Sequence, residues 1–479
     1  MGFLPRPGAF PALRVFADRL EPRGPFAEAQ AAWLLPDETA VRRLTTLLES
    51  TRAGVAAHFY MDAELQGVLC AARWPHTFVS DSLAMAETAI AMVRRGAERI
   101  VVLGVDFMSE NVRAVLDSQG LAHVPVHRVA PEPIGCTLAE AAASPAYDTW
   151  LEAAARTPRA LHVIYINTGL DVKARAEARI PTITCTSSNA LKTLLGAIVQ
   201  VPGVALRFGP DTHMGRNLRV TLERLAAGPP TEAARLHPGL TPAAVAAALE
   251  RYEAFAEGAC AVHQVFGAEV ARVVREHYAH ALLTAHLEVP GEMFDLALAA
   301  RADGRGTVGS TSDILGFILA RLDAALAAGD SAMPPVILGT EAGMITSIVR
   351  AVQARLREAR SDLGVEILFP VAPEAISATG ERDLPIVPGV TASEGCALDG
   401  GCASCPYMKM NSLAALETLL ERVRDGATPE DLRGFEPRRY TELLAGRPLA
   451  EWGTRPILAM RELQRTGRLG EELVRRVGG

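Results

Sequence analysis

The sequence predicts an α/β protein with parallel sheets that carry helices on both faces. Short apolar runs rich in Val, Ile and Leu alternate with longer helical patterns through most of the 479 residues, and that alternation is typical of parallel sheets. The runs are continuously apolar, as in VVL at residues 101–103 and VIYI at residues 163–166, because strands of a parallel sheet are buried on both faces. The composition, 49% hydrophobic and 22% charged, is that of a globular protein with real cores.

Nine apolar runs are expected as strands, with helices in the intervals between them. The strands are expected at 55–60, 77–79, 100–103, 162–166, 183–185, 204–208, 282–286, 336–338 and 366–369. Helices are expected at 82–95, 111–119, 189–199, 241–256, 314–328 and 345–359. The helix at 241–256 has Thr241 as its N-cap and Pro242 at its first position, and the stretch before it, from residue 226, is expected to be a loop. Residues 1–45 show no strong strand signal, and the tail after Asn411 is expected to form a helical, charged outer layer.

Polar residues follow the carboxyl ends of these runs, as in HFY, VSDS, YINTG, CTSSNA and AHLE. Open α/β sheets bind ligands at that edge, toward which helix N-termini also point. The pattern recurs from residue 58 to residue 343. It therefore predicts several similar α/β units that face one site.

Composition argues against two classes of partner. The net charge is −7 and no long Lys/Arg run is present, so the electrostatic footprint of a nucleic-acid-binding protein is missing. No stretch approaches the roughly 18 apolar residues that a membrane span requires. The first 20 residues are interrupted by Pro and charge and lack the core of a signal peptide, so a cytoplasmic location is expected.

The cysteines carry the densest chemical signal, in EGCALDGGCASCPYMKMN at residues 394–411. Cys402 and Cys405 form a CxxC pair, six residues after Cys396, and such a pair alone can be a redox couple, half a zinc site or part of an iron–sulfur site. A closed zinc site usually has two such pairs, and the chain has no second one. Cys136 and Cys260 are candidate partners because each lies in a Gly-containing turn before an expected helix, where a thiolate is stabilised. Taken singly, each can equally be a small buried apolar residue.

A series of segments in matching order resembles the quinolinate synthases. The segments are HFYMDAELQ, SDSL, GVDFMSEN, GCTLAE, YINTGLDVKA, CTSSNA, GPDTHMGRNL, GACAVH, AHLE, GSTS, GTEAG and CPYMKMN, between about residues 50 and 412. The resemblance implies three similar three-layer α/β domains in a pseudo-threefold arrangement around a central cluster site. These domains are expected at 46–145, 146–262 (with an insertion at about 226–248) and 263–385. An N-terminal extension of residues 1–45 would precede them, and a C-terminal segment of residues 386–479 would follow, its helical tail packing on the first domain.

The resemblance also implies a cofactor and a reaction. By motif, Cys136, Cys260 and Cys405 are the ligands of a [4Fe–4S] cluster, which leaves one iron open to act as a Lewis acid on the substrate. The family condenses iminoaspartate with dihydroxyacetone phosphate to give quinolinate, phosphate and water. L-Aspartate oxidase is the implied supplier of the unstable imine.

Site residues follow from the same motifs. The implied catalytic residues are Glu288 as general acid/base, Tyr60 as proton relay and His286 beside the carboxylate. The implied substrate-binding residues are His58, Ser82, Tyr165, Asn167, Ser187, His286, Glu288 and Thr311. Cys185 and Cys70 are interpreted as packing residues, Glu341 as structural, and Lys173 as a further candidate, although a lone lysine is more often solvated.

Alternatives follow from departures in the motifs. The family's usual HPEC reads HLEV here, which keeps His286 and Glu288 but loses the proline and the cysteine. A diverged paralogue that acts on another small dicarboxylate is therefore one alternative. The others are a non-catalytic iron–sulfur sensor and a zinc-binding structural protein. Glu288, Tyr60 and Asn167 together favour the enzyme, since a sensor needs only the cysteines.

Overall fold

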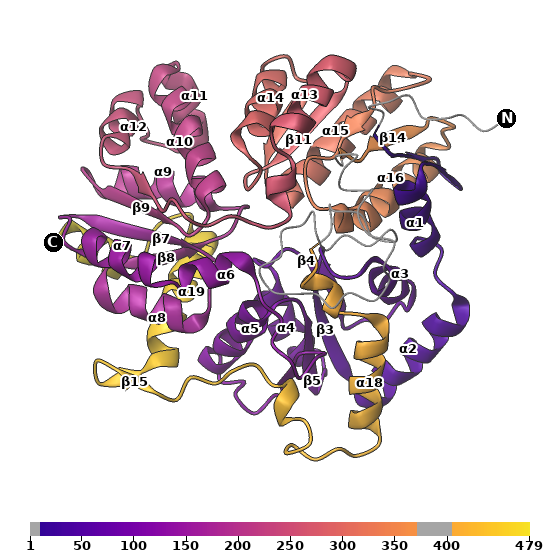
Figure 1. The fold of residues 1–479 in the computed structure, drawn as a ribbon, viewed down its shortest axis with the longest axis horizontal. Helices are drawn as coiled ribbons and strands as arrows, with labels where there is room; N and C mark the ends of the chain where they lie inside the picture. The colour runs from indigo at the N-terminus through magenta and orange to yellow at the C-terminus, as the bar shows by residue number, and fades with distance from the viewer. Residues whose placement is uncertain (1–9, 371–404) are drawn as a thin grey trace.

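Three sheets with one strand order organise the molecule, and Figure 1 shows their units as lobes around its middle. The computed structural model describes residues 10–370 and 405–479. In each unit four parallel strands lie in the order second, first, third, fourth. The α/β class is thereby confirmed, and the three units share a topology. Their relation by a threefold rotation stays a prediction.

The first unit holds the sheet β4-β3-β5-β6. Its strands are β3 (Ala53–His58), β4 (Thr77–Ser80), β5 (Arg99–Leu103) and β6 (Val126–His127). Helices α2 (Glu38–Thr51), α3 (Ala63–Ala71), α4 (Met85–Arg94) and α5 (Asp106–Ser118) cover it. Every residue of β3 is buried, which explains why the sequence shows an unbroken apolar run there.

The second unit holds the sheet β8-β7-β9-β10. Its strands are β7 (Ala160–Tyr165), β8 (Thr182–Cys185), β9 (Ala205–Gly209) and β10 (Glu253–Ala254). The helices are α6 (Thr137–Ala142), α7 (Pro145–Ala155), α8 (Leu170–Arg179), α9 (Ala190–Gln200), α10 (Thr212–Ala227), α11 (Pro230–Leu236) and α12 (Pro242–Leu249).

The insertion in the second unit is more helical than expected. The predicted loop after residue 226 contains α11, which starts at a proline, a residue suited to the first helical turn. Helix α12 begins as predicted, with the Thr241 hydroxyl accepting the Ala244 N–H at 3.2 Å. It ends at Leu249 rather than residue 256, because residues 253 and 254 pair with β9 and complete the sheet.

The third unit holds the six-stranded sheet β12-β11-β13-β14-β1-β2. Its strands are β11 (Leu282–His286), β12 (Gly306–Gly309), β13 (Val336–Ile337) and β14 (Val365–Leu368), joined by antiparallel β1 (Ala12–Val15) and β2 (Leu20–Arg23). Helices α1 (Pro25–Trp33), α13 (Ala268–His277), α14 (Gly291–Ala302), α15 (Thr311–Ala328) and α16 (Ile345–Ala359) accompany it. The expectation of no strand before residue 45 was wrong. Each missed strand is four residues long, too short to show a pattern, and β2 (LEPR) is an edge strand with polar residues.

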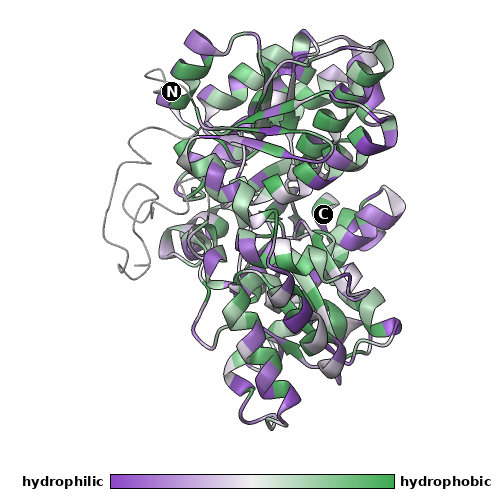
Figure 2. Cartoon of the chain, turned by 90° about the vertical axis from the view of Figure 1, so that its right-hand side faces the viewer, coloured by the Kyte–Doolittle hydropathy of each residue, from purple (hydrophilic) through white to green (hydrophobic). Residues whose placement is uncertain are grey.

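The C-terminal tail packs on two units rather than one. Helix α18 (Leu413–Arg424) lies against α2 and α3 of the first unit, with Leu416, Leu419 and Leu420 buried. Helix α19 (Leu449–Thr466) lies against α8 and β8 of the second unit as well as α5 of the first, and α20 (Glu471–Gly478) ends the chain. The tail is therefore part of the packed structure. Figure 2 shows hydrophobic and hydrophilic residues side by side on the helices of the molecule. Among the described residues, no helix is both long and apolar enough to cross a membrane.

Candidate active site

Equivalent positions in the three units carry the polar side chains of the site. Each first strand ends in a polar residue followed by a second one two positions on, which places both on one side of the sheet edge. The pairs are His58 and Tyr60 after β3, Tyr165 and Asn167 after β7, and His286 and Glu288 after β11. A hydroxyl follows each second strand: Ser82 after β4, Ser187 after β8 and Thr311 after β12. A cysteine follows each fourth strand: Cys136, Cys260 and Cys405.

All twelve of these residues line one pocket. The structure thus brings together every residue that the sequence analysis named for catalysis, substrate binding or metal ligation. The C-terminal cysteines Cys396 and Cys402 lie outside the described residues.

Glu288 is the centre of the polar network in the pocket. The side chain is 3% exposed. The Tyr165 hydroxyl donates to Oε1, while His263 Nδ1 lies 3.1 Å from Oε2 and His286 Nδ1 lies 3.7 Å from Oε1. Burial alone raises the pKa of the Glu288 carboxyl, but the two histidines and the hydrogen bond from Tyr165 outweigh it and hold the pKa below its usual value. Glu288 is therefore a charged carboxylate near neutral pH.

The negative charge of Glu288 raises the pKa of several neighbouring groups. Burial and the Glu288 charge raise the pKa of Asp211, which caps α10 by accepting the Met214 N–H at 2.7 Å. The same two causes raise the pKa of Tyr60 and of Tyr165, so both phenols keep their protons. Burial lowers the pKa of His286 to about 3. Within this pocket the charged Glu288 therefore lies beside a neutral His286 and two neutral phenols, those of Tyr60 and Tyr165.

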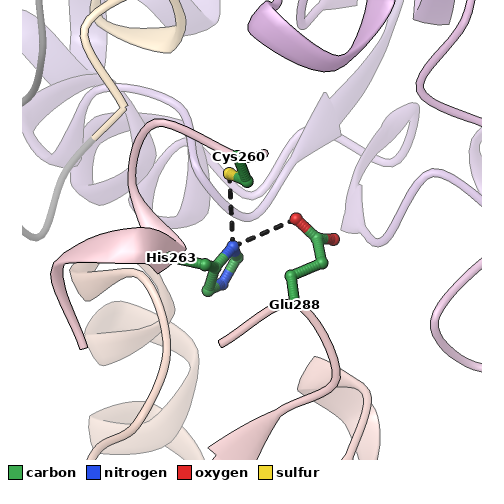
Figure 3. Close-up of side chains that lie close together, drawn as sticks. All are labelled: Cys260, His263 and Glu288. Carbon is green, nitrogen blue, oxygen red and sulfur yellow. Dashed lines mark hydrogen bonds and ion pairs between the residues drawn. The ribbon is translucent and has the colours of Figure 1, made fainter. Parts of the chain in front are cut away.

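His263 connects the carboxylate to a cysteine and was missed by the sequence analysis. Figure 3 shows its ring between Cys260 and Glu288. Nδ1 lies 3.3 Å from Cys260 Sγ, and Nε2 lies 3.4 Å from Thr340 Oγ1. The ring also stacks on His286 with centroids 4.5 Å apart. The motif GACAVH contained the signal, because the third residue after Cys260 returns to the same side of a helical turn.

Cys260, His263 and Glu288 form a group that can hold a metal ion. One ligand atom from each lies within 4.8 Å of the others. Thiolate, imidazole and carboxylate are all ordinary ligands of transition metals. The pocket therefore combines a metal-binding donor set with buried acid–base groups.

The three cysteines share one local geometry. Cys136 is the N-cap residue of α6, Cys260 precedes the 3₁₀ turn His263–Val265, and Cys405 precedes the 3₁₀ turn Met408–Met410. In each case backbone N–H groups of the following turn point at the sulfur and favour the thiolate.

Burial acts in the opposite direction on the same thiols. It raises the pKa of Cys136 to about 11 and that of Cys405 to about 12. Burial, the Glu288 charge and the other two cysteines also raise the pKa of Cys260, and all three cysteines line the same pocket. Without a cation, these three thiols stay protonated.

Thr311 is poised to bind a ligand. The neighbouring Ser310 caps α15: its hydroxyl accepts the Asp313 N–H at 3.2 Å, and Asp313 accepts the Ser310 N–H in return. The buried Thr311 hydroxyl has no hydrogen-bond partner among residues 10–370 and 405–479. A buried polar atom of this kind needs a partner from a ligand or water.

Other residues around the pocket have structural contacts. Asp81 Oδ2 accepts the Ser188 hydroxyl at 2.8 Å and ties the first unit to the second. The buried Glu341 accepts the Gly343 N–H at 2.7 Å and the Cys405 N–H at 3.3 Å, and burial raises its pKa to about 8. Cys185 ends β8 inside the core, in agreement with its interpretation as a packing residue.

Comparisons with known proteins agree with the motif pattern. The profile of the family described as quinolinate synthetase A protein matches residues 42–431. The chloroplastic quinolinate synthase of Nicotiana tabacum is 46% identical over 99% of this chain and 67% of its own length, and that of Arabidopsis thaliana is 45% identical over 99% and 68%. The quinolinate synthase of Saccharolobus solfataricus is 24% identical over 83% of this chain and 97% of its own. The relatives at 44–46% identity are chloroplastic by name, which contradicts the expected cytoplasmic location.

Proposed function

Because the chain belongs to the quinolinate synthetase A family and is an enzyme of quinolinate synthesis, we propose that its pocket joins iminoaspartate to dihydroxyacetone phosphate. The products are quinolinate, one phosphate and two waters, which together account for every atom of the two substrates. The observation that supports this most directly is the meeting of three cysteines, one after the last strand of each unit, beside the Glu288 network. L-Aspartate oxidase is the proposed source of the unstable imine.

Cys136, Cys260 and Cys405 are the proposed ligands of a [4Fe–4S] cluster. Thiolates are soft ligands that favour iron–sulfur clusters, and backbone N–H groups directed at the sulfurs tune such sites. The raised pKa values of the three thiols fit this assignment, since a buried thiolate needs a compensating cation. When bound, the cluster supplies an open iron that acts as a Lewis acid, because three protein thiolates leave one corner without a protein ligand.

A single zinc ion on Cys260, His263 and Glu288 is the competing occupant. It would leave Cys136 and Cys405 as two buried thiols without a metal partner. It would also occupy Glu288, the pocket carboxylate whose pKa is held down by His263, His286 and Tyr165. The cluster uses all three cysteines and leaves Glu288 free for proton transfer, so the cluster is the better assignment.

Glu288 is the proposed general base. The condensation requires imine–enamine and keto–aldose proton shifts, and a carboxylate that is charged near neutral pH can accept those protons. His263 bridges Glu288 to Thr340, whose hydroxyl lies 3.2 Å from the Tyr60 hydroxyl. A proton taken up at Glu288 can therefore pass along His263 and Thr340 to Tyr60.

Substrate anions are the proposed ligands of the remaining groups. Tyr165 and Asn167 would bind a substrate carboxylate from the end of β7, with His58 as a further contact. The hydroxyl turns at Ser82 and Ser187 lie where backbone N–H groups and hydroxyls form anion sites. The unpartnered Thr311 hydroxyl completes this set.

Anaerobic purification with determination of iron, sulfide and zinc tests the cofactor, and a quinolinate assay with both substrates tests the reaction. We expect about four irons and four sulfides per chain, with loss of both in C136A, C260A and C405A. The matched control is C185A, a substitution in the core of the second sheet, which should keep the cluster. One zinc per chain without cluster absorbance would contradict the proposal, as would a loaded protein that makes no quinolinate.

A further inference from the structure

Lysine is almost absent from this chain. Of its 48 basic residues only Lys173, Lys192 and Lys409 are lysines, and the other 45 are arginines. Each lysine follows a proposed site residue by four to six positions, after Asn167, Ser187 and Cys405. Where arginine serves nearly everywhere else, a lysine that is also fully buried points to a position that needs a compact ammonium group.

Lys173 occupies such a position. It lies on α8 and has 0% of its surface exposed, unlike the exposed Lys192 on α9. Its Nζ donates to the Ile166 carbonyl at 3.0 Å and to the Thr168 carbonyl. Lys173 is therefore not the solvated surface group that a lone lysine more often is, because the carbonyls at the end of β7 bind the ammonium from inside the unit.

The two carbonyls flank Asn167 in a tight turn. The Thr168 N–H donates to the Ile166 carbonyl at 2.7 Å, which closes a three-residue γ-turn with Asn167 at its centre. The Ile166 N–H donates to the Cys185 carbonyl at 2.8 Å and anchors the start of the turn to β8. Only the Lys173 ammonium bridges both ends of the turn from behind among the hydrogen bonds of the described residues.

The charge of Lys173 is balanced by a second layer of groups. Glu110 and Asp171 favour the charged form electrostatically, although burial lowers the Lys173 pKa to about 7. Glu110 is itself fixed by the Leu170 N–H at 2.9 Å and the Tyr440 hydroxyl at 2.8 Å. The face of the Phe107 ring lies 5.9 Å from Nζ. Residues from the first unit and from the C-terminal tail therefore enclose a lysine of the second unit.

We propose that Lys173 is a positioning residue, which holds Asn167 and Tyr165 toward the pocket by bridging the Ile166 and Thr168 carbonyls from behind. This inference rests on the proposed substrate-binding role of Asn167 and Tyr165. A planar, larger guanidinium cannot replace the ammonium, because both carbonyls converge on one buried point. Displacement of a binding group by about 1 Å can reduce catalytic efficiency about 100-fold.

The variant Lys173→Met tests the role, because it keeps an unbranched side chain and removes all three donors. We expect KM for iminoaspartate, generated from oxaloacetate and ammonia, to rise at least about 10-fold, with kcat changed much less, since a carboxylate-binding group acts on substrate and transition state alike. Iron and sulfide per chain should match the unsubstituted protein. Lys173→Arg should behave like Lys173→Met, whereas the matched controls Lys192→Met and Lys192→Arg should leave KM unchanged.

Two outcomes would overturn the inference. One is a Lys173→Met enzyme with KM within twofold of the unsubstituted enzyme. The other is an activity loss that only follows the loss of folded, cluster-bearing protein, which marks a purely structural lysine. If Lys173→Met does not fold, Lys173→Gln is the second variant. It retains an uncharged amide NH2 donor and should show an intermediate KM. Failure of both variants to fold also assigns Lys173 a purely structural role.

Asn167→Ala separates this inference from the proposed function. If Asn167→Ala leaves KM unchanged, the proposed substrate contact fails and the role of Lys173 fails with it. If Asn167→Ala raises KM and Lys173→Met does not, only the positioning role is lost.

Discussion

Replacing Glu288 by glutamine removes one negative charge from the pocket and almost no volume. The carboxylate is 3% exposed and is held in its charged form by His263, His286 and Tyr165. The glutamine oxygen can still accept a hydrogen bond from the Tyr165 hydroxyl, and its NH2 group takes the place of the carboxylate oxygen that faces His263 Nδ1. We therefore expect the free energy of unfolding to change by no more than about 1 kcal/mol, near the net value of one hydrogen bond.

Turnover should respond very differently from stability. A positioned general base contributes roughly 10²- to 10⁴-fold, or about 3 to 5 kcal/mol of activation free energy. We expect kcat for quinolinate formation to fall by that factor with iron and sulfide unchanged. The matched control is Glu292→Gln, on the exposed side of α14 four residues on, which should keep full activity.

The measurement is quinolinate formation under anaerobic conditions, normalised to iron content. A Glu288→Gln enzyme that keeps its cluster and more than about a third of its turnover would refute the assignment of Glu288 as base. Loss of the metal instead would show that Glu288 is a ligand, as in the group formed with Cys260 and His263. The two readouts therefore separate proton transfer from metal binding.

The remaining predictions concern single substitutions. His127 is buried with neither ring nitrogen hydrogen-bonded in the described part of the chain, and burial lowers its pKa to about 4. The unfolded state therefore binds a proton that the folded state does not between pH 6.5 and 4, so stability falls as pH falls through that window. His127→Leu should reduce this slope of unfolding free energy by about 1.4 kcal/mol per pH unit in denaturant titrations. Thr311→Val should raise KM about 10-fold without loss of melting temperature, since the hydroxyl has no partner in the described residues, whereas Ser310→Ala should cost about 1 kcal/mol of stability through its lost cap. Glu341→Ala should lower iron content, because the Cys405 N–H loses its acceptor, and faster alkylation of Cys405 in the metal-free protein would report the loosened segment.

The elements that the sequence predicted well are those whose local pattern reflects their burial. Each of the nine expected strands lies within two residues of an observed one at both ends, because an unbroken apolar run is what burial on both faces requires. Strands β1 and β2 were not predicted because each has only four residues, and β2 is in addition an exposed antiparallel edge strand with polar residues. Helix α11 was not predicted because two consecutive prolines are typical of a loop, although the second is an acceptable first residue of a helix.

The candidate site could be named from the sequence because its motifs resemble those of a known family, and the structure shows that these motifs repeat with the topology. A pair of polar residues after the first strand, a hydroxyl after the second and a cysteine after the fourth recur in all three units. His263 and Lys173 do not belong to that repeat. Each is distinguished by its tertiary contacts. His263 lies between a thiol and a carboxylate from different segments. Lys173 donates to two backbone carbonyls and is near a glutamate of another unit.

The three units carry different side chains at the equivalent positions of their shared pattern. The equivalent first-strand pairs are His and Tyr, Tyr and Asn, and His and Glu, so only the third unit places a carboxylate at that position. A second carboxylate at that position would raise one pKa of the pair and would repel anionic substrates. With neutral donors in two units and one charged base in the third, the pocket can attract several substrate anions and still remove a proton. Introducing Asp at Asn167 should therefore weaken substrate binding more than Ala does, although Asp is closer to Asn in size, because charge rather than volume sets what this position can hold.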